Sequence, residues 1–218
     1  KFISSEAKVI GSINTIKKSN SRLIGYNTDY HGVMKSLISF KKKKKILILG
    51  CGGAGKAVIL ASIKKFKNAF FYFYNRDKKK LNTFIKKLKI KNYEIINYKK
   101  ILSLYGVDLT INTTSIGFNS WIFRNKKFYN LMYFTPFSNL NKVHGIKSRN
   151  KKEFLRKNQN CINNDKLNYF KFLEQNSNCE FFDIIYNPQM TTFLKLAKIN
   201  GHKILNGLDM NLDQAVKA

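Results

Sequence analysis

The residues best suited to bind a phosphate group lie in one glycine-rich segment. The apolar run at 46–49 is followed by Gly50, Cys51, Gly52, Gly53, Ala54 and Gly55. In a G-x-G-x-x-G spacing the first glycine permits a tight turn, the second lets a pyrophosphate approach the backbone, and the third lets a helix pack on a strand. A helix that begins there presents free N–H groups to phosphate. We therefore predict a dinucleotide site, with a purely structural turn as the alternative.

A second group of polar residues follows the next apolar run, 69–74, where dinucleotide-binding folds recognise the adenosine ribose. Asn75, Arg76 and Lys80 stand there. A guanidinium and an ammonium group can hold a 2′-phosphate, which favours NADP. Asp77 lies between them, and a carboxylate beside the ribose would favour NAD instead. A solvated charge run at the start of a helix is the structural alternative in so lysine-rich a chain.

A third group, Asn27, Thr28 and Asp29, lies where a predicted strand gives way to a helix. Taken alone, these residue types are ordinary helix-capping residues. They belong, however, to a series of polar motifs that occur in one order along the chain. The series comprises 10–15, 25–32, the glycine-rich segment, Asn75 and Arg76, 112–117, 183–188 and 206–215.

This series resembles the shikimate dehydrogenase family, which reduces 3-dehydroshikimate with NADPH. The resemblance covers about 1–118 and 180–218, and its specificity lies in the joint occurrence of motifs that are each common. It implies that Asp29 is the acidic member of a Lys–Asp pair that handles the proton of the substrate hydroxyl during hydride transfer. It implies that Asn14, Tyr186 and Gln214, with Asp29, bind the substrate. It also implies cofactor contacts from Gly50, Cys51, Gly52, Gly53, Ala54, Asn75, Arg76, Lys80, Ile184 and Gly207, the last two beside the nicotinamide.

The chain also departs from the family pattern. The family's catalytic lysine and its serine-rich carboxylate-binding motif are implied to precede Lys1. The first residue is not Met, so we expect a fragment of a longer polypeptide that turns over little substrate alone, with a multifunctional polypeptide as one source. Asp209 replaces a usual glycine and Asn211 a usual leucine, which puts the packing of the last helix in question. The stretch between Gly117 and Asp183 is longer than the family needs.

The alternation of expected strands and helices that position these residues predicts an α/β fold. We expect a doubly wound parallel sheet of the Rossmann-like type, with remnants of a second, substrate-binding lobe. Strands are expected at 13–16, 23–26, 46–49, 69–74, 93–96, 107–112 and 180–185. The polar turn around Asn20 predicts that 13–16 and 23–26 form a hairpin, and we expect 46–49 and 69–74 to be adjacent parallel strands. Helices are expected at 5–10, 30–40, 55–66, 78–88, 99–105, 191–199 and 210–218. We assign 1–40 to the remnant lobe, 41–206 to the NADP-binding domain and 207–218 to a helix that returns to the lobe. Within the domain, 119–178 reads as a low-complexity insertion, part helical at best and mobile.

Composition narrows the choice of partners. The net charge is +29 over 218 residues, which would suit nucleic acid, but almost all of it is lysine and only five residues are arginine. We therefore expect a small-molecule substrate and neither specific nucleic-acid binding nor a membrane partner. The three cysteines and three histidines show no disulfide or metal-ligand spacing, which indicates no metal and a reducing compartment such as the cytoplasm. A non-catalytic basic binding module and a dehydrogenase acting on quinate remain open alternatives.

Overall fold

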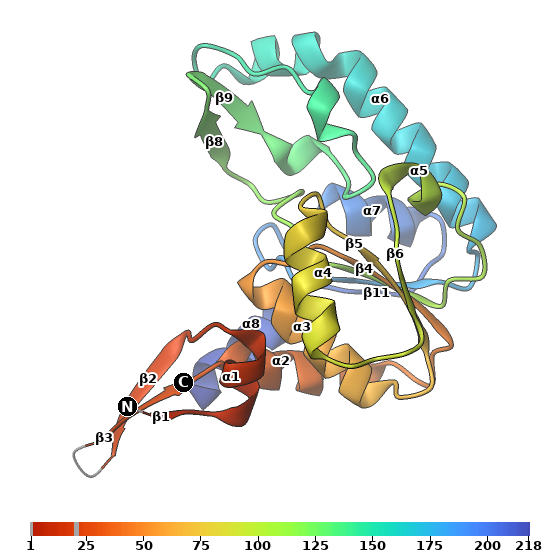
Figure 1. Ribbon diagram of the computed structural model, residues 1–218. Coiled ribbons are helices and arrows are strands. Elements are labelled where there is room, and N and C mark those ends of the chain that lie inside the picture. The colour runs from red at the N-terminus through yellow and green to blue at the C-terminus, as the bar shows by residue number, and fades with distance from the viewer. Residues whose placement is uncertain (1, 20–21) are drawn as a thin grey trace.

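The computed structural model describes residues 2–19 and 22–218 and contains, in that range, a six-stranded parallel sheet (Figure 1). The strand order is β11-β10-β7-β4-β5-β6. The strands are β4 (Lys45–Leu49), β5 (Phe70–Tyr74), β6 (Tyr93–Ile95), β7 (Leu109–Asn112), β10 (Glu180–Asp183) and β11 (Ile204–Leu205). The expected adjacency of the first two is confirmed, since Ile46 pairs with Phe71 in a parallel register. The predicted fold class is confirmed.

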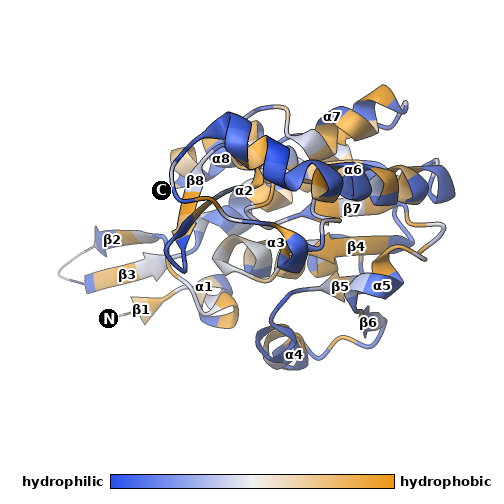
Figure 2. Cartoon of the chain, turned by 90° about the horizontal axis from the view of Figure 1, so that it is seen from above, coloured by the Kyte–Doolittle hydropathy of each residue, from blue (hydrophilic) through white to orange (hydrophobic). Residues whose placement is uncertain are grey.

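Both faces of this sheet are covered, which explains why the central strand β4 carries the continuous apolar run 46–49. Side chains alternate between faces along a strand. Ile46 and Ile48 of β4 enter a core with α3 (Gly53–Lys65) and α4 (Lys78–Lys87). Leu47 and Leu49 enter a second core with α5 (Tyr98–Ile101), α6 (Lys151–Gln175) and α7 (Thr192–Ile199). In Figure 2 the strand β4 is accordingly hydrophobic over most of its length.

The first 40 residues form a separate small sheet and two helices. The sheet has the order β1-β3-β2, made of β1 (Phe2–Ile3), β2 (Thr15–Ser19) and β3 (Arg22–Tyr26). The predicted hairpin of β2 and β3 is confirmed by their antiparallel register, while its predicted turn around Asn20 lies outside the described residues. The helices are α1 (Ser5–Ile10) and α2 (Thr28–Ser36), the latter continued by a 3-10 turn at Leu37–Ser39.

The last helix, α8 (Leu208–Lys217), returns to this part of the molecule and packs on α2. The contact is close at Gly32, where an added Cβ would lie 2.4 Å from the carbonyl oxygen of Met210. Lys35 and Asp213 form an ion pair across the two helices. Both chain ends therefore lie on the side of the small sheet (Figure 1). The division into a cofactor domain and a remnant lobe stays a prediction.

The expectation that 119–178 is part helical at best understates its regular structure, while its mobility stays a prediction. The stretch contains the hairpin of β8 (Trp121–Arg124) and β9 (Lys127–Asn130), 3-10 turns at Leu131–Tyr133 and Leu140–Lys142, and the 25-residue helix α6. The buried positions of α6 follow a helical period, but two of them are the polar residues Asn158 and Asp165. Asn158 bonds to the backbone of His144, and Asp165 bonds to Thr135. These buried polar residues interrupt the apolar pattern by which a helix is recognised.

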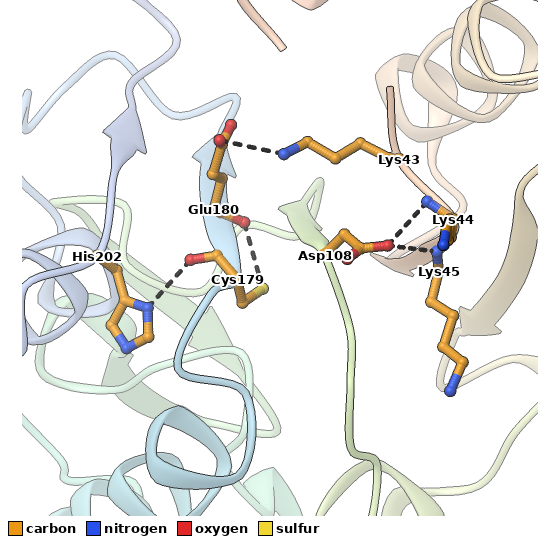
Figure 3. A network of polar contacts seen from close by, with 7 residues as sticks. All are labelled: Lys43, Lys44, Lys45, Asp108, Cys179, Glu180 and His202. Atoms are coloured by element: carbon orange, nitrogen blue, oxygen red, sulfur yellow. Dashed lines mark hydrogen bonds and ion pairs between the residues drawn. The ribbon is translucent and has the colours of Figure 1, made fainter. Parts of the chain in front are cut away.

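The amino ends of the sheet strands are joined by polar contacts (Figure 3). A carboxylate oxygen of Asp108 accepts the backbone N–H groups of Lys44 and Lys45 at 2.7 and 2.8 Å. Lys43 pairs with Glu180 at 3.1 Å. These contacts lie at the edge opposite the glycine-rich turn, so they align the strands without taking part in the candidate site.

Candidate functional site

The glycine-rich turn follows β4 at the carboxyl edge of the sheet. Gly50 has φ +108°, a conformation that favours glycine. An added Cβ would lie 2.5 Å from Thr113 Oγ1 at Gly50 and 2.7 Å from the same atom at Gly55. Gly50 and Gly55 are therefore needed for the turn and for packing against β7. At Gly52, by contrast, an added Cβ would meet nothing within 4 Å, so the backbone there is open to a ligand.

The start of α3 is suited to an anion. Its N-cap is Gly52, which makes no side-chain cap hydrogen bond, and its first turn holds no acidic residue. Uncapped N–H groups at a helix start are donors for phosphate. Burial raises the pKa of the Cys51 thiol, and the positive charges of Lys56 and Lys80 oppose that rise. Cys51 itself is buried, so its thiol is not open to a ligand.

The residues that follow β5 lie beside this turn, because the backbone N–H of Gly50 donates to the carbonyl of Tyr74 at 2.8 Å. Asp77 is the N-cap of α4 and accepts the N–H of Lys80 at 2.9 Å. Asn75 donates its side-chain amide to the carbonyl of Asp77 at 2.8 Å. Arg76 and Lys80 are exposed. Asp77 thus has a structural task, while the two cations are free to bind a phosphate.

A polar cluster brings together three of the four residues expected to bind substrate, namely Asn14, Asp29 and Gln214. Asn14 donates its side-chain amide to an Asp29 carboxylate oxygen at 2.9 Å. Its own carbonyl oxygen accepts the Thr28 N–H at 2.9 Å. The Thr28 hydroxyl lies 3.1 Å from Gln214 Oε1 and 3.2 Å from Asn14 Oδ1, and donates its single proton to one of them at a time. The cluster joins the segment before β2, the start of α2 and α8.

Of the three candidate capping residues Asn27, Thr28 and Asp29, one caps the helix α2. Asn27 is the N-cap of α2 and accepts the N–H of Tyr30 at 3.2 Å. Asp29 is therefore not occupied as a cap. Burial raises the pKa of Asp29, and the hydrogen bond from Asn14 opposes that rise. No lysine among residues 2–19 and 22–218 is a cause of the shift, so the described residues supply no cationic partner for this carboxylate.

The fourth expected substrate residue, Tyr186, makes no hydrogen bond to this cluster within residues 2–19 and 22–218. It follows β10 and is exposed, with 45% of its surface accessible. Ile184 and Gly207 are in close contact, since a Cβ on Gly207 would lie 2.0 Å from the carbonyl oxygen of Ile184. Gly207 is the N-cap of α8, the helix that carries Gln214. The end of β10 and the start of α8 are thereby held together at the carboxyl edge.

One segment of chain lies between the glycine-rich turn and the polar cluster. A Cβ on Gly53 would lie 3.5 Å from the Ser12 hydroxyl. The carbonyl of Ser12 accepts the side-chain amide of Asn27 at 3.1 Å. The segment around Ser12 therefore connects the glycine-rich turn with the start of α2 beside the polar cluster.

Sequence reasoning missed two residues that organise this region, Thr28 and Asp183. Thr28 is 1% exposed and links Asn14 to Gln214. Asp183 is fully buried and accepts hydrogen bonds from Asn112, Ile185 and Thr191. Both stand in recognised motifs, but neither has a neighbour in the sequence that reveals its distant partners.

Two further observations concern metals and membranes. Across the described residues, no three His, Cys, Asp or Glu side chains are grouped so as to hold a metal ion. The helices of the same range include none with the length and apolar character needed to span a bilayer.

Known proteins similar to this chain include several shikimate dehydrogenases. No family model matches. The shikimate dehydrogenase (NADP(+)) of Clostridium beijerinckii is 30% identical over 226 residues, covering 100% of this chain and 63% of that protein. A crystal structure of shikimate dehydrogenase from Aquifex aeolicus gives a TM-score of 0.66 at 30% identity, covering 99% of this chain and 63% of that one. A shikimate dehydrogenase solved in complex with NADP+ gives 0.63 at 27% identity, covering 98% and 62%. The chain thus spans less than two thirds of the length of these relatives.

Proposed function

Because this chain belongs to the shikimate dehydrogenase family, whose members match it from end to end, we propose that it is the cofactor-binding and proton-transferring part of an NADP-dependent shikimate dehydrogenase. The reaction is the reversible reduction of 3-dehydroshikimate to shikimate. One observation carries the proposal. The Asn14, Thr28, Asp29 and Gln214 cluster lies next to an uncapped glycine-rich turn, with only the segment around Ser12 between them.

The turn fits the phosphates of NADP. The N–H groups at the start of α3 donate to the pyrophosphate, and Gly52 leaves room for its approach. Arg76 and Lys80 bind the 2′-phosphate, with Asn75 beside them, while Ile184 and Gly207 line the nicotinamide side. When bound, NADP supplies the hydride acceptor, and the protein supplies orientation.

The polar cluster supplies the substrate contacts and the base. Asn14 and Gln214 hydrogen-bond the ring hydroxyls, and Tyr186 approaches from the loop after β10. Asp29 takes the proton of the reacting hydroxyl as hydride leaves the carbon. Its pKa is raised by burial, which makes its carboxylate a stronger base than an exposed aspartate, and the bond from Asn14 fixes its orientation.

The small sheet with α2 and α8 belongs, in this proposal, to the substrate-binding lobe. Several of its apolar side chains are exposed, among them Phe2, Ile3, Ile16 and Leu23. The described residues place no cation on Asp29. We therefore assign the lysine of the Lys–Asp pair to a part of the polypeptide other than 2–19 and 22–218, and we expect these 218 residues alone to be nearly inactive.

All three cysteines are free thiols, which supports a reducing, cytoplasmic location.

The experiment is shikimate-dependent reduction of NADP+ by the natural full-length polypeptide, by residues 1–218, and by the Asp29→Asn variant of each. We expect activity in the full-length protein, a loss of about 10²- to 10⁴-fold in its Asp29→Asn variant, and little activity in the shorter chain. Quinate serves as the competing substrate. Strong activity of 1–218 alone would contradict the assignment of the lysine. Full activity of Asp29→Asn would contradict the role of Asp29.

A further inference from the structure

Asp183 is a fully buried carboxylate at the last position of β10. One of its oxygens accepts the side-chain amide of Asn112 at 3.0 Å and the N–H of Ile185 at 3.1 Å. The other accepts the Thr191 hydroxyl at 2.8 Å. These three donors belong to three segments that meet at the carboxyl edge of the sheet.

Each of the three donor residues also makes a hydrogen bond to another residue at that edge. The side-chain oxygen Oδ1 of Asn112, the last residue of β7, accepts the N–H of Thr114 at 3.0 Å and the Thr114 hydroxyl at 2.7 Å. Thr191 is the N-cap of α7 and accepts the N–H of Leu194 at 3.3 Å. The backbone carbonyl of Ile185 accepts the N–H of Gly207 at 3.1 Å. Ile185 is thus held by Asp183 on its amide side and by the start of α8 on its carbonyl side.

The stability of this carboxylate depends on these hydrogen bonds. Burial raises the pKa of Asp183 to about 7, and the bonds from Ile185, Thr191 and Asn112 oppose that rise. No cation contributes among the described residues. A buried carboxylate without a cation is costly unless its acceptor sites are filled. All three segments must therefore stay in place for the carboxylate to be satisfied.

We propose that Asp183 is a positioning residue for the nicotinamide side of the cofactor site, because it fixes 184–190 against 112–117 and the start of α7. The inference rests on the proposed function, since it takes Ile184 and Gly207 as nicotinamide contacts. Asp183 touches neither cofactor nor substrate in this scheme. It acts through Ile185, whose neighbours are Ile184 and Tyr186. The adenine side, with Arg76 and Lys80, lies across β4 and should not depend on it.

The chain offers a matched control for a test. Thr135 donates its hydroxyl to the buried Asp165 at 2.8 Å and accepts the N–H of Phe137 at 3.2 Å. Thr191 makes the same pair of bonds, to Asp183 and from Leu194, at 2.8 and 3.3 Å. Both threonines are buried. Thr191→Val and Thr135→Val therefore remove equivalent hydroxyls, and only the first lies at the candidate site.

The readouts are the dissociation constants of NADP+ and of 2′,5′-ADP, which occupies the adenine side only, together with amide exchange of Ile185 without ligand. We expect Thr191→Val to weaken NADP+ about fivefold, a typical loss for one hydrogen bond, to leave 2′,5′-ADP within about twofold, and to speed exchange at Ile185. Thr135→Val should change none of the three, and Thr191→Ser, which keeps the hydroxyl, should restore NADP+ binding. Should Thr191→Val fail to fold, Asp183→Asn makes the same comparison.

Equal weakening of NADP+ and 2′,5′-ADP by Thr191→Val would overturn the proposal, because it would show a general structural effect. An unchanged NADP+ constant would also overturn it. Failure of the wild-type protein to bind either ligand would refute the proposed function itself, and the positioning role would fall with it.

Discussion

Gly52→Ala should separate cofactor binding from folding. Gly52 has φ −75° and ψ −165°, which alanine also adopts. Its added methyl group would meet no protein atom within 4 Å. The free energy of unfolding should change by less than about 1 kcal/mol, the scale of an N-cap effect. For a chain of this size that shifts Tm by no more than about 4 °C.

The same methyl group would occupy the space through which a pyrophosphate approaches the backbone. A charge-assisted hydrogen bond contributes about 1.5 to 3 kcal/mol. Displacing one phosphate oxygen from its N–H donor should therefore weaken NADP+ by about 10- to 100-fold. Isothermal titration calorimetry with NADP+ and a thermal melt of the same sample measure the two effects.

Gly32→Ala should have the opposite effect to Gly52→Ala, because it should destabilise the fold and leave cofactor binding unchanged. Its Cβ would lie 2.4 Å from the backbone oxygen of Met210, so α2 and α8 must move apart. The cost is about 1 to 3 kcal/mol of overpacking, a fall in Tm of about 2 to 12 °C, with NADP+ affinity of the folded protein unchanged within about threefold. Wild-type NADP+ affinity in Gly52→Ala would refute the phosphate-binding role of the turn. A fall in the Tm of Gly52→Ala by clearly more than about 4 °C would refute the separation of cofactor binding from folding.

Three other changes have expected outcomes. Thr28→Val removes the hydroxyl shared by Asn14 and Gln214 and should raise KM for shikimate in the full-length enzyme about tenfold, while the NADP+ constant stays within about twofold; steady-state kinetics with an unchanged KM would contradict this. Burial raises the pKa of Asp165 from 3.8 to about 7, so between about pH 4 and 7 the unfolded chain has lost a proton that the folded chain keeps. The free energy of unfolding should fall as pH rises through that window, by at most about 1.4 kcal/mol per pH unit for this group. In urea melts at several pH values, Asp165→Asn should remove the contribution of Asp165 to the pH dependence of the free energy of unfolding and leave the contribution of Asp183. An unchanged pH dependence would show that Asp165 is ionised in the folded protein. Gly207→Ala places a Cβ 2.0 Å from the Ile184 carbonyl and should lower Tm by more than Gly32→Ala; an equal or smaller fall would show that the segment after β10 adapts.

The fold was predictable where local sequence and tertiary context agree. β4 reads as a strand because Ile46 to Leu49 are all apolar, and both faces of β4 are buried. The helix α6 was missed because Asn158 and Asp165 take core-facing positions and are satisfied by backbone and threonine donors more than ten residues away. β1 and β11 have two residues each, too short for any periodicity.

The candidate site, like the fold, was predictable from the sequence only in part. The functions of Gly50 and Gly55 follow from their spacing, because each position needs a residue without a side chain. The link from Thr28 to Gln214 spans 186 residues, and the contacts of Asp183 come from the end of β7, the segment after β10 and the N-cap of α7. Such contacts depend on the completed fold, so a capping motif and a strand end were all that the local sequence could indicate.

The cofactor assignment is tested most directly by the dissociation constants of NADP+ and NAD+ for the wild-type protein and for Arg76→Ala. Arg76 and Lys80 are exposed, so solvent screening reduces the contribution of each contact. We still expect at least a tenfold preference for NADP+ in the wild type and a clear loss of that preference in Arg76→Ala. Equal constants for the two cofactors, or a ratio that Arg76→Ala leaves unchanged, would contradict the assignment and point to Asp77 as the residue that sets cofactor choice.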